Sequence, residues 1–120
     1  MNPSIHAPSD ISVECSLLAA DRGLDEPSGA RRLRGRDLDI EFVRIARGET
    51  LRRGPGTAAG EEVAAVLEGT LHVESGEESY VLSVGEGIII PPGQGSRWSA
   101  RESGGLLYRV IVRTDGAVVP

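Results

Sequence analysis

Residues 85–93 read Gly-Glu-Gly-Ile-Ile-Ile-Pro-Pro-Gly, and this stretch decides how the chain folds. It places turn glycines, a short apolar strand and a Pro-Pro-Gly turn at fixed offsets. Upstream, residues 62–69 read Glu-Val-Ala-Ala-Val-Leu-Glu-Gly, a strand that a carboxylate opens and a glycine closes. This strand is apolar on both faces apart from its ends, as expected inside a sandwich. Together the two stretches predict a small β-barrel built from two sheets.

The composition supports a single all-β domain. The 120 residues are enough for one hydrophobic core and too few for two. Sixteen glycines and seven prolines lie between apolar runs, which is typical of short strands joined by tight turns. No 3.6-residue apolar stripe persists long enough to predict a major helix. We expect roughly eight or more short strands, spaced as in a barrel or jelly roll.

The chain divides into an arm, a barrel and a tail. Residues 1–37 predict an N-terminal tail and arm that could hold edge strands. Residues 38–113 predict the barrel, and residues 114–120 a C-terminal tail. An apolar segment at residues 11–20 could form a first strand or a short helix.

The first strand of the barrel shows a partial alternation. Leu38, Ile40 and Phe42 share one face, whereas Asp39 and Glu41 share the other. Alternation of this kind predicts a half-buried strand.

Charge and cysteine content narrow the classes of function. The net charge is −5, so attraction to nucleic acid or to anionic lipid is not expected. All thirteen basic residues are arginine, so no lysine can form a Schiff base. Cys15 is the single cysteine, which excludes an internal disulfide and fits a reducing compartment. Residues 1–10 lack a secretory signal and no apolar run has membrane-spanning length, so we expect a cytoplasmic protein without membrane or nucleic-acid partners.

These motifs resemble those of the cupin superfamily, in particular its small single-domain members. The second cupin motif is Gly, five residues, Pro, one residue, Gly, two residues, His, three residues, Asn. Gly85, Pro91 and Gly93 match its first three positions, but its histidine falls on Ser96 and its asparagine on Ala100. The resemblance implies a cupin-type jelly-roll barrel of two antiparallel sheets, a pocket between them and a homodimer.

The first cupin motif ends in a glutamate and a glycine, which Glu62 and Gly69 match, and Gly48 is the candidate for its opening glycine. Two histidines precede the glutamate in the family motif, but no histidine lies between Gly48 and Gly69. Depending on the alignment, the two positions fall on Gly56 and Ala58, on Pro55 and Thr57, or on Gly54 and Gly56.

Resemblance to cupins would normally imply a bound iron, manganese, nickel or zinc, but the residues do not support one. A tight divalent site needs about three or four protein ligands, and only Glu62 stands at a ligand position. His6 lies in the N-terminal tail, and His72 alternates with Leu71 and Val73, so it should point away from the pocket. We therefore expect no metal and no other cofactor.

Glycine, alanine and serine in place of imidazoles leave room for a small organic ligand beside Gly56, Ala58 and Ser96. Glu62 is the candidate catalytic residue, a general acid or base if it faces the barrel. The alternative is that Glu62 lies beside Glu61 at the solvated mouth of a strand.

Other candidate ligand-binding residues surround this position in the expected barrel. Trp98 shares a strand face with Ser96 and forms either a stacking wall or, as we favour, part of the core. Tyr108 is either a hydrogen-bond donor in the pocket or a core residue. The arginines that could pair with Glu62 or with an anionic substrate, or remain exposed, are Arg44, Arg52 and Arg53.

Two metal-independent functions are favoured, and a metal-dependent function stays a third alternative. The prediction is a metal-independent enzyme, an isomerase, cyclase, dehydratase or lyase acting on a small organic substrate, as metal-free cupins of secondary metabolism do. Glu62 would move the proton, and Tyr108 or an arginine would stabilise developing negative charge. The alternative is a non-catalytic module that senses or sequesters a small molecule. An enzyme of this kind needs at least two convergent ionisable groups, and the sequence places only Glu62.

Overall fold

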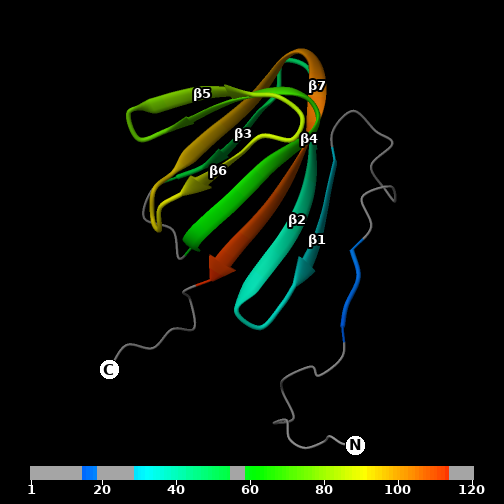
Figure 1. Cartoon of the computed structure of the whole chain (residues 1–120), viewed down its shortest axis with the longest axis vertical. Coiled ribbons are helices and arrows are strands. Elements are labelled where there is room, and N and C mark those ends of the chain that lie inside the picture. The colour runs from blue at the N-terminus through cyan, green and yellow to red at the C-terminus, as the bar shows by residue number, and fades with distance from the viewer. Residues whose placement is uncertain (1–14, 19–28, 55–58, 114–120) are drawn as a thin grey trace, which may run out of the picture.

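A computed structural model describes residues 15–18, 29–54 and 59–113 of the chain (Figure 1). These residues form seven strands and no helix. The strands are β1 (Gly29–Arg34), β2 (Leu38–Ile45), β3 (Thr50–Arg53), β4 (Ala59–Ser75), β5 (Glu78–Leu82), β6 (Gly87–Ile90) and β7 (Ser96–Arg113). Most of the apolar segment at 11–20, and the tail at 114–120, lie outside the described residues.

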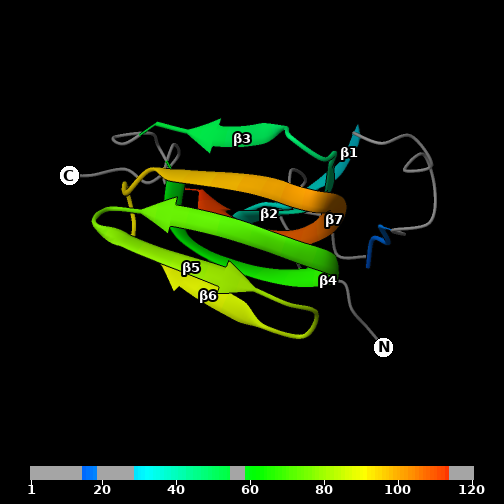
Figure 2. The ribbon, with the colours of Figure 1, turned by 90° about the horizontal axis from the view of Figure 1, so that it is seen from above.

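The strands form one antiparallel sheet that folds back on itself. Its order is β1-β2-β7-β4-β5, with β3 added to β7 and β6 added to β4. The first half of β7 pairs with β3 and its second half with β2, because β7 bends between them. Figure 2 shows β4 and β7 doubling back together, which closes the sheet into two layers. The expected all-β jelly roll is confirmed.

Glycines allow the two long strands to bend at the same place. Gly69 of β4 lies opposite Gly105 of β7, and the register shifts on either side of Gly69. Gly69 has a φ of 76°, and a Cβ on it would overlap the carbonyl oxygen of Gly104. The sequence suggested that Gly69 ends one strand and begins another. That interpretation is wrong, because Gly69 is a bulge within the continuous strand β4.

The core lies between the two layers and is mainly aliphatic. Strand β4 is buried on only one face in its first half, since Val63 is 47% exposed and Ala64 is fully buried. The prediction that this strand is buried on both faces is therefore wrong. The core residues are Val43, Ile45, Ala64, Val66, Leu71, Val73, Leu82, Ile90, Trp98, Ala100 and Leu107.

Strand β2 is half-buried, as its alternation predicts, but its polar face is the buried one. Asp39 and Glu41 are buried together with Val43 and Ile45. Phe42 lies on the outer face, where its ring packs against a ring of β7 at a centroid distance of 5.0 Å. The carboxylates point inward because cationic partners are available there, as described below.

The described part of the arm contributes an edge strand. Strand β1 pairs with β2 along its full length, from Gly29 opposite Arg44 to Arg34 opposite Asp39.

Among the described residues there is no helix long and apolar enough to cross a membrane.

Candidate functional site

Glu62 lies on the inner face of β4, where its side chain is 0% exposed. Arg53 of β3 donates a hydrogen bond from Nη2 to its Oε1. On the other side, Nη1 of Arg109 in β7 lies 3.5 Å from its Oε2. Glu62 thus faces the barrel interior between two guanidinium groups, which excludes the alternative that it lies at a solvated strand mouth.

A row of charges extends from Glu62 to the surface. The Nε of Arg109 donates to Oε1 of Glu41 at 3.0 Å, and Oε2 of Glu41 accepts from Nη2 of Arg32 at 3.1 Å. We call the five residues Arg32, Glu41, Arg109, Glu62 and Arg53 the charge chain. Each comes from a different strand, and three arginines against two glutamates leave one net positive charge.

The buried members of the charge chain depend on one another for compensation. A buried charge is costly unless a partner compensates it, and Arg109 is the partner of both buried glutamates. The side chains of Arg109 and Glu41 are 7% and 8% exposed, whereas Arg32 is 51% exposed. Water therefore compensates the outer end of the chain, and only protein groups compensate its middle.

Strand register places these side chains together. Arg32 lies directly opposite Glu41, and Glu41 lies directly opposite Arg109. Directly opposed side chains on antiparallel strands are about 4.5–5.5 Å apart at Cβ, within easy reach of an arginine. Glu62 lies opposite Ile111, two residues from Arg109 on the same face of β7. The antiparallel pairing of β1, β2, β7 and β4 thus determines the order of the charges.

Four buried polar side-chain atoms have no hydrogen-bond partner among the described residues. They come from the inner faces of neighbouring strands, since Arg53 lies opposite Ser96 and Trp98 follows Ser96 on the same face. Such atoms are rare in native proteins, and they require a partner. They are Arg53 Nε, Glu62 Oε2, Ser96 Oγ and Trp98 Nε1.

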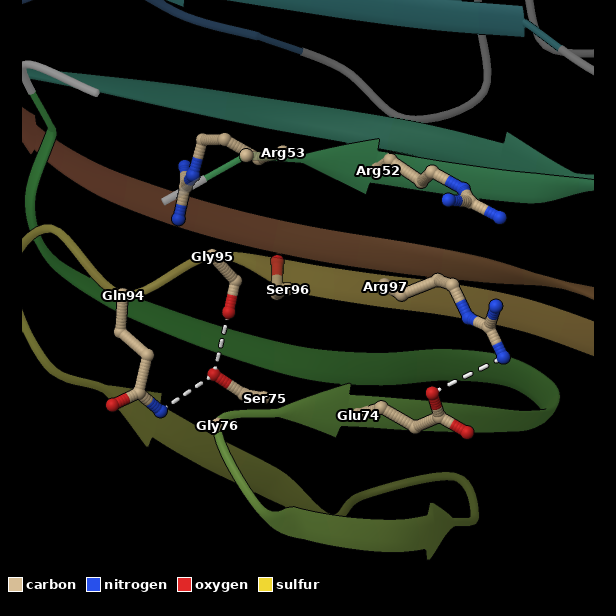
Figure 3. Close-up of a pocket in the computed structure, with 10 residues that line it drawn as sticks. Arg52, Arg53, Glu74, Ser75, Gly76, Gln94, Gly95, Ser96 and Arg97 are labelled. Atoms are coloured by element: carbon tan, nitrogen blue, oxygen red, sulfur yellow. Dashed lines mark hydrogen bonds and ion pairs between the residues drawn. The ribbon is translucent and has the colours of Figure 1, made fainter. Parts of the chain in front are cut away.

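A cleft of about 540 Å³ is lined by two of these four residues, Arg53 and Ser96 (Figure 3). The end of β3, the β4–β5 turn and the start of β7 form its walls. We call it the arginine cleft, because Arg52, Arg53 and Arg97 line it. Ser96 also lines it, so two of the residues that hold an unpartnered buried donor, Arg53 and Ser96, contribute to its wall.

One wall of the arginine cleft is fixed by hydrogen bonds. Gln94 Nε2 donates to Ser75 Oγ at 2.7 Å, and Ser75 Oγ donates to the carbonyl of Gly95 at 2.7 Å (Figure 3). These bonds tie the β4–β5 turn to the segment before β7. The cleft is therefore a preformed feature of the barrel end.

Comparison with known proteins now assigns the family. A family model described as a cupin domain matches residues 41–112. The chain belongs to the cupin family. A search of curated proteins gave no match.

Solved structures share the fold. A protein of unknown function from Rhizobium leguminosarum is 25% identical, with a TM-score of 0.64 over 83% of this chain and 97% of that chain. A protein from Thermus thermophilus is 20% identical, with a TM-score of 0.67 over 78% of this chain and 90% of that chain. The cupin domain of an XRE family transcriptional regulator from Enterobacter cloacae is 16% identical, with a TM-score of 0.64 over 72% of this chain and 97% of that chain.

The cupin barrel separates the residues that the sequence grouped around Glu62. Arg44 lies on the outer face, where its Nη1 is 2.8 Å from Oε1 of Glu68. Its guanidinium, through this hydrogen bond, lowers the pKa of the Glu68 carboxyl. Tyr108 also lies outside the barrel and packs against Phe42. Neither side chain therefore lies beside Glu62.

Other predicted site residues lie at the cleft or in the core. Arg52 and Ser96 line the arginine cleft, at its rim and at its inner wall. Trp98 is fully buried in the core, the placement that we favoured for it. Gly56 and Ala58 lie outside the described residues.

Sequence reasoning missed Glu41 and Arg109, which hold the middle of the charge chain. The alternation of residues along β2 and β7 contains the signal that could have found them. Glu41 is in phase with Val43 and Ile45, and Arg109 is in phase with Leu107. Opposite charges that share a phase with aliphatic residues on two strands indicate a buried ion pair.

The ligand set does not fit the transition metal that cupins commonly bind. Glu62 stands at a ligand position, but both of its oxygens already face guanidinium groups. A divalent ion there would lie beside two positive charges, which raises its energy. Ser96 offers only a hydroxyl, and no group of three metal-ligating side chains occurs in the described part of the chain. The arginines supply positive charge that a metal would otherwise supply.

Metal uptake can be measured directly. We expect purified protein dialysed against Zn²⁺, Ni²⁺ or Mn²⁺ to retain far less than one equivalent of metal by elemental analysis. The reason is that no imidazole or thiolate stands at the ligand positions of the cupin motifs. Thermal unfolding should be the same with and without EDTA. Near-stoichiometric metal, removable by EDTA with loss of stability, would contradict this expectation.

Proposed function

We propose that this cupin binds a small polar organic molecule in the arginine cleft, without a protein-bound transition metal. The observation that carries the proposal is that two residues lining the cleft, Arg53 and Ser96, each hold a buried donor (Nε and Oγ) without a hydrogen-bond partner among the described residues. A buried donor without an acceptor costs about 1–3 kcal/mol, and a ligand oxygen would remove that cost. The volume also lies within the range of about 300–1,000 Å³ that is common for small-molecule sites.

Binding without catalysis agrees best with the position of Glu62. Its side chain is fully buried, it does not line the arginine cleft, and Arg53 both lines the cleft and bonds to it. A ligand in the cleft therefore meets the guanidinium of Arg53 before it can meet the carboxylate. Proton transfer by Glu62 would require Arg53 to move.

One observation favours a second function, that of a metal-independent isomerase, cyclase, dehydratase or lyase. Glu62 Oε2 has no hydrogen-bond partner among the described residues. A ligand that draws Arg53 into the cleft would bring Glu62 into contact with the ligand. Glu62 would then act as general acid or base, and Arg53 would stabilise negative charge on the substrate.

Replacing Ser96 tests the proposed binding site. Protein from its native host, denatured and extracted, should release one small molecule detectable by mass spectrometry. For that molecule, Ser96→Val should weaken binding about tenfold by calorimetry, because one buried hydrogen bond of about 1–1.5 kcal/mol is lost. Ser99→Val is the matched control, since Ser99 lies on the same strand with the opposite face and should bind normally. Absence of any retained or binding molecule, or equal affinity of Ser96→Val and wild type, would contradict the proposal.

Glu62→Gln distinguishes the two functions. The retained molecule should be incubated with wild-type and Glu62→Gln protein and then examined by NMR. Binding without catalysis predicts that both proteins return the molecule unchanged. Conversion by the wild type that stops in Glu62→Gln, with affinity retained, would establish the enzyme instead.

A further inference from the structure

We infer that the ligand of the arginine cleft carries an oxyanion, a carboxylate or a phosphate, which binds between Arg52 and Arg97. The inference rests on the proposed function of the cleft as a small-molecule site and names the class of its ligand. In this arrangement the acid group occupies the rim of the cleft, and the rest of the molecule lies along the wall that Ser96 and Arg53 help to form.

The charge of the arginine cleft is opposite to that of the protein. The whole chain carries a formal net charge of −5, yet the residues lining the cleft include three arginines and one glutamate. Glu62 compensates Arg53, so Arg52 and Arg97 against Glu74 leave a local excess of one positive charge. A concave site with the sign opposite to its surroundings concentrates ligands of the other sign. The field of the cleft therefore selects an anion.

The register of β3 and β7 places two like charges face to face. Arg52 lies directly opposite Arg97, and like charges in directly opposed positions destabilise a sheet. Figure 3 shows both guanidinium groups on the same side of the cleft, away from Arg53. An oxyanion between them converts this repulsion into two charge-assisted contacts.

Within the described ranges, Glu74 is the only carboxylate that lines the cleft, and it compensates just one of these two arginines. Arg97 Nη2 lies 3.1 Å from Oε1 of Glu74, and both side chains are nearly half exposed. Arg52 makes no ion pair or side-chain hydrogen bond within the described part of the chain. Its guanidinium fork is therefore available, in the geometry that matches a carboxylate or phosphate.

The test compares acids with an uncharged compound of the same shape. ¹⁵N-labelled protein should be titrated with benzoate, phenyl phosphate and benzamide while amide signals are followed by NMR. We expect both acids to shift the signals of Arg52 and Arg97, and to bind at least about tenfold more tightly than benzamide, because a charge-assisted pair adds about 1.5–3 kcal/mol. The relative affinities of benzoate and phenyl phosphate then identify the preferred acid. Affinity should fall as salt is added, since the rim is exposed.

Single substitutions locate the acid group. Arg52→Ala should reduce the affinity for benzoate and phenyl phosphate about tenfold. Arg52→Lys should give an intermediate affinity, because it keeps the charge and loses the fork. Arg36→Ala is the matched control: its side chain is 66% exposed, and it removes the same charge from a loop that does not line the cleft. Both arginines are exposed, so neither substitution threatens the fold.

The outcomes separate this inference from the proposed function. If benzamide binds as tightly as benzoate, or if Arg52→Ala and Arg36→Ala bind the acids equally, the oxyanion inference is overturned. The binding function then still stands, provided that Ser96→Val weakens binding of the molecule retained from the host. If no molecule is retained and none of the three compounds binds, both proposals fail.

Discussion

Replacing Arg109 by methionine should lower the free energy of unfolding by about 3–5 kcal/mol, because it leaves two buried carboxylates without their shared partner. Arg109 contacts Glu41 through Nε and Nη2 and approaches Glu62 through Nη1. Methionine fills much of the volume, so the cost comes from charge rather than from a cavity. In a domain of this size the melting temperature should fall by about 12 °C or more.

Urea and thermal unfolding, followed by circular dichroism, measure this effect. Arg97→Met is the matched control, since Arg97 lies on the same strand and forms an ion pair with Glu74 that is half in solvent. That substitution should cost only about 0–1 kcal/mol. Equal destabilisation by both substitutions would show that Arg109 acts through its bulk and not through the buried carboxylates.

A double substitution tests the same electrostatic argument from the opposite direction. Glu41→Leu together with Arg109→Met removes a buried cation and one of its anions, and Glu62 keeps its contact with Arg53. Replacing a buried ion pair by apolar side chains is often close to neutral, whereas removing one partner is not. The double variant should therefore be more stable than Arg109→Met alone. If it is less stable, the cost in the single variant did not come from an uncompensated carboxylate.

The sequence predicted the fold because glycine and proline positions determine where strands can turn. Gly85, Pro91 and Gly93 surround β6 as expected, and Gly85 and Gly93 both have positive φ angles. The same reasoning failed at Gly69, where the residue type is the same but the strand continues. A glycine marks a backbone that needs unusual freedom, and the sequence does not say whether that backbone turns or bulges.

The candidate site was predicted only in part. The sequence left open whether Glu62 faces the barrel or lies at the solvated mouth of a strand. Arg53 was one of three arginines considered as its partner. The structure selects Arg53 because it shares the inner face of β3 with Leu51, whereas Arg52 alternates outward. Tyr108 was expected in the pocket or in the core, but its ring packs against Phe42 on the outer face. Hydropathy favours the face of Tyr108 as the core face, because the opposite face of β7, which is the buried one, carries the charged Arg109.

Glu62 connects the family pattern with the chemistry of this chain. It stands where the cupin motif has its metal-ligating glutamate, and a buried carboxylate needs a cation wherever it occurs. Here Arg53 and Arg109 provide that cation as permanent parts of the fold. The positive charge is thus fixed by packing rather than exchanged with solvent, and Arg53 also reaches the arginine cleft. A carboxylate held between two guanidinium groups is a poor ligand for a metal ion.

Trp98→Ala should be as damaging to stability as the loss of Arg109, at about 3–5 kcal/mol. Trp98 is the largest fully buried side chain and lies between Leu51 of β3 and Val73 of β4 in the register. Its removal leaves a cavity at the place where the two layers meet. Thermal unfolding by circular dichroism measures the loss, which should lower the melting temperature by about 12 °C or more.

Trp98→Phe is the control that separates packing from ligand recognition. Phenylalanine keeps the aromatic core contacts and removes Nε1, which has no hydrogen-bond partner among the described residues. If Trp98 serves only the core, Trp98→Phe should cost less than half as much stability as Trp98→Ala and should bind the retained molecule normally. If its affinity falls tenfold while its stability is unchanged, the indole nitrogen contacts the ligand, and the site extends from the arginine cleft into the barrel. The two variants together therefore decide how deep the ligand lies.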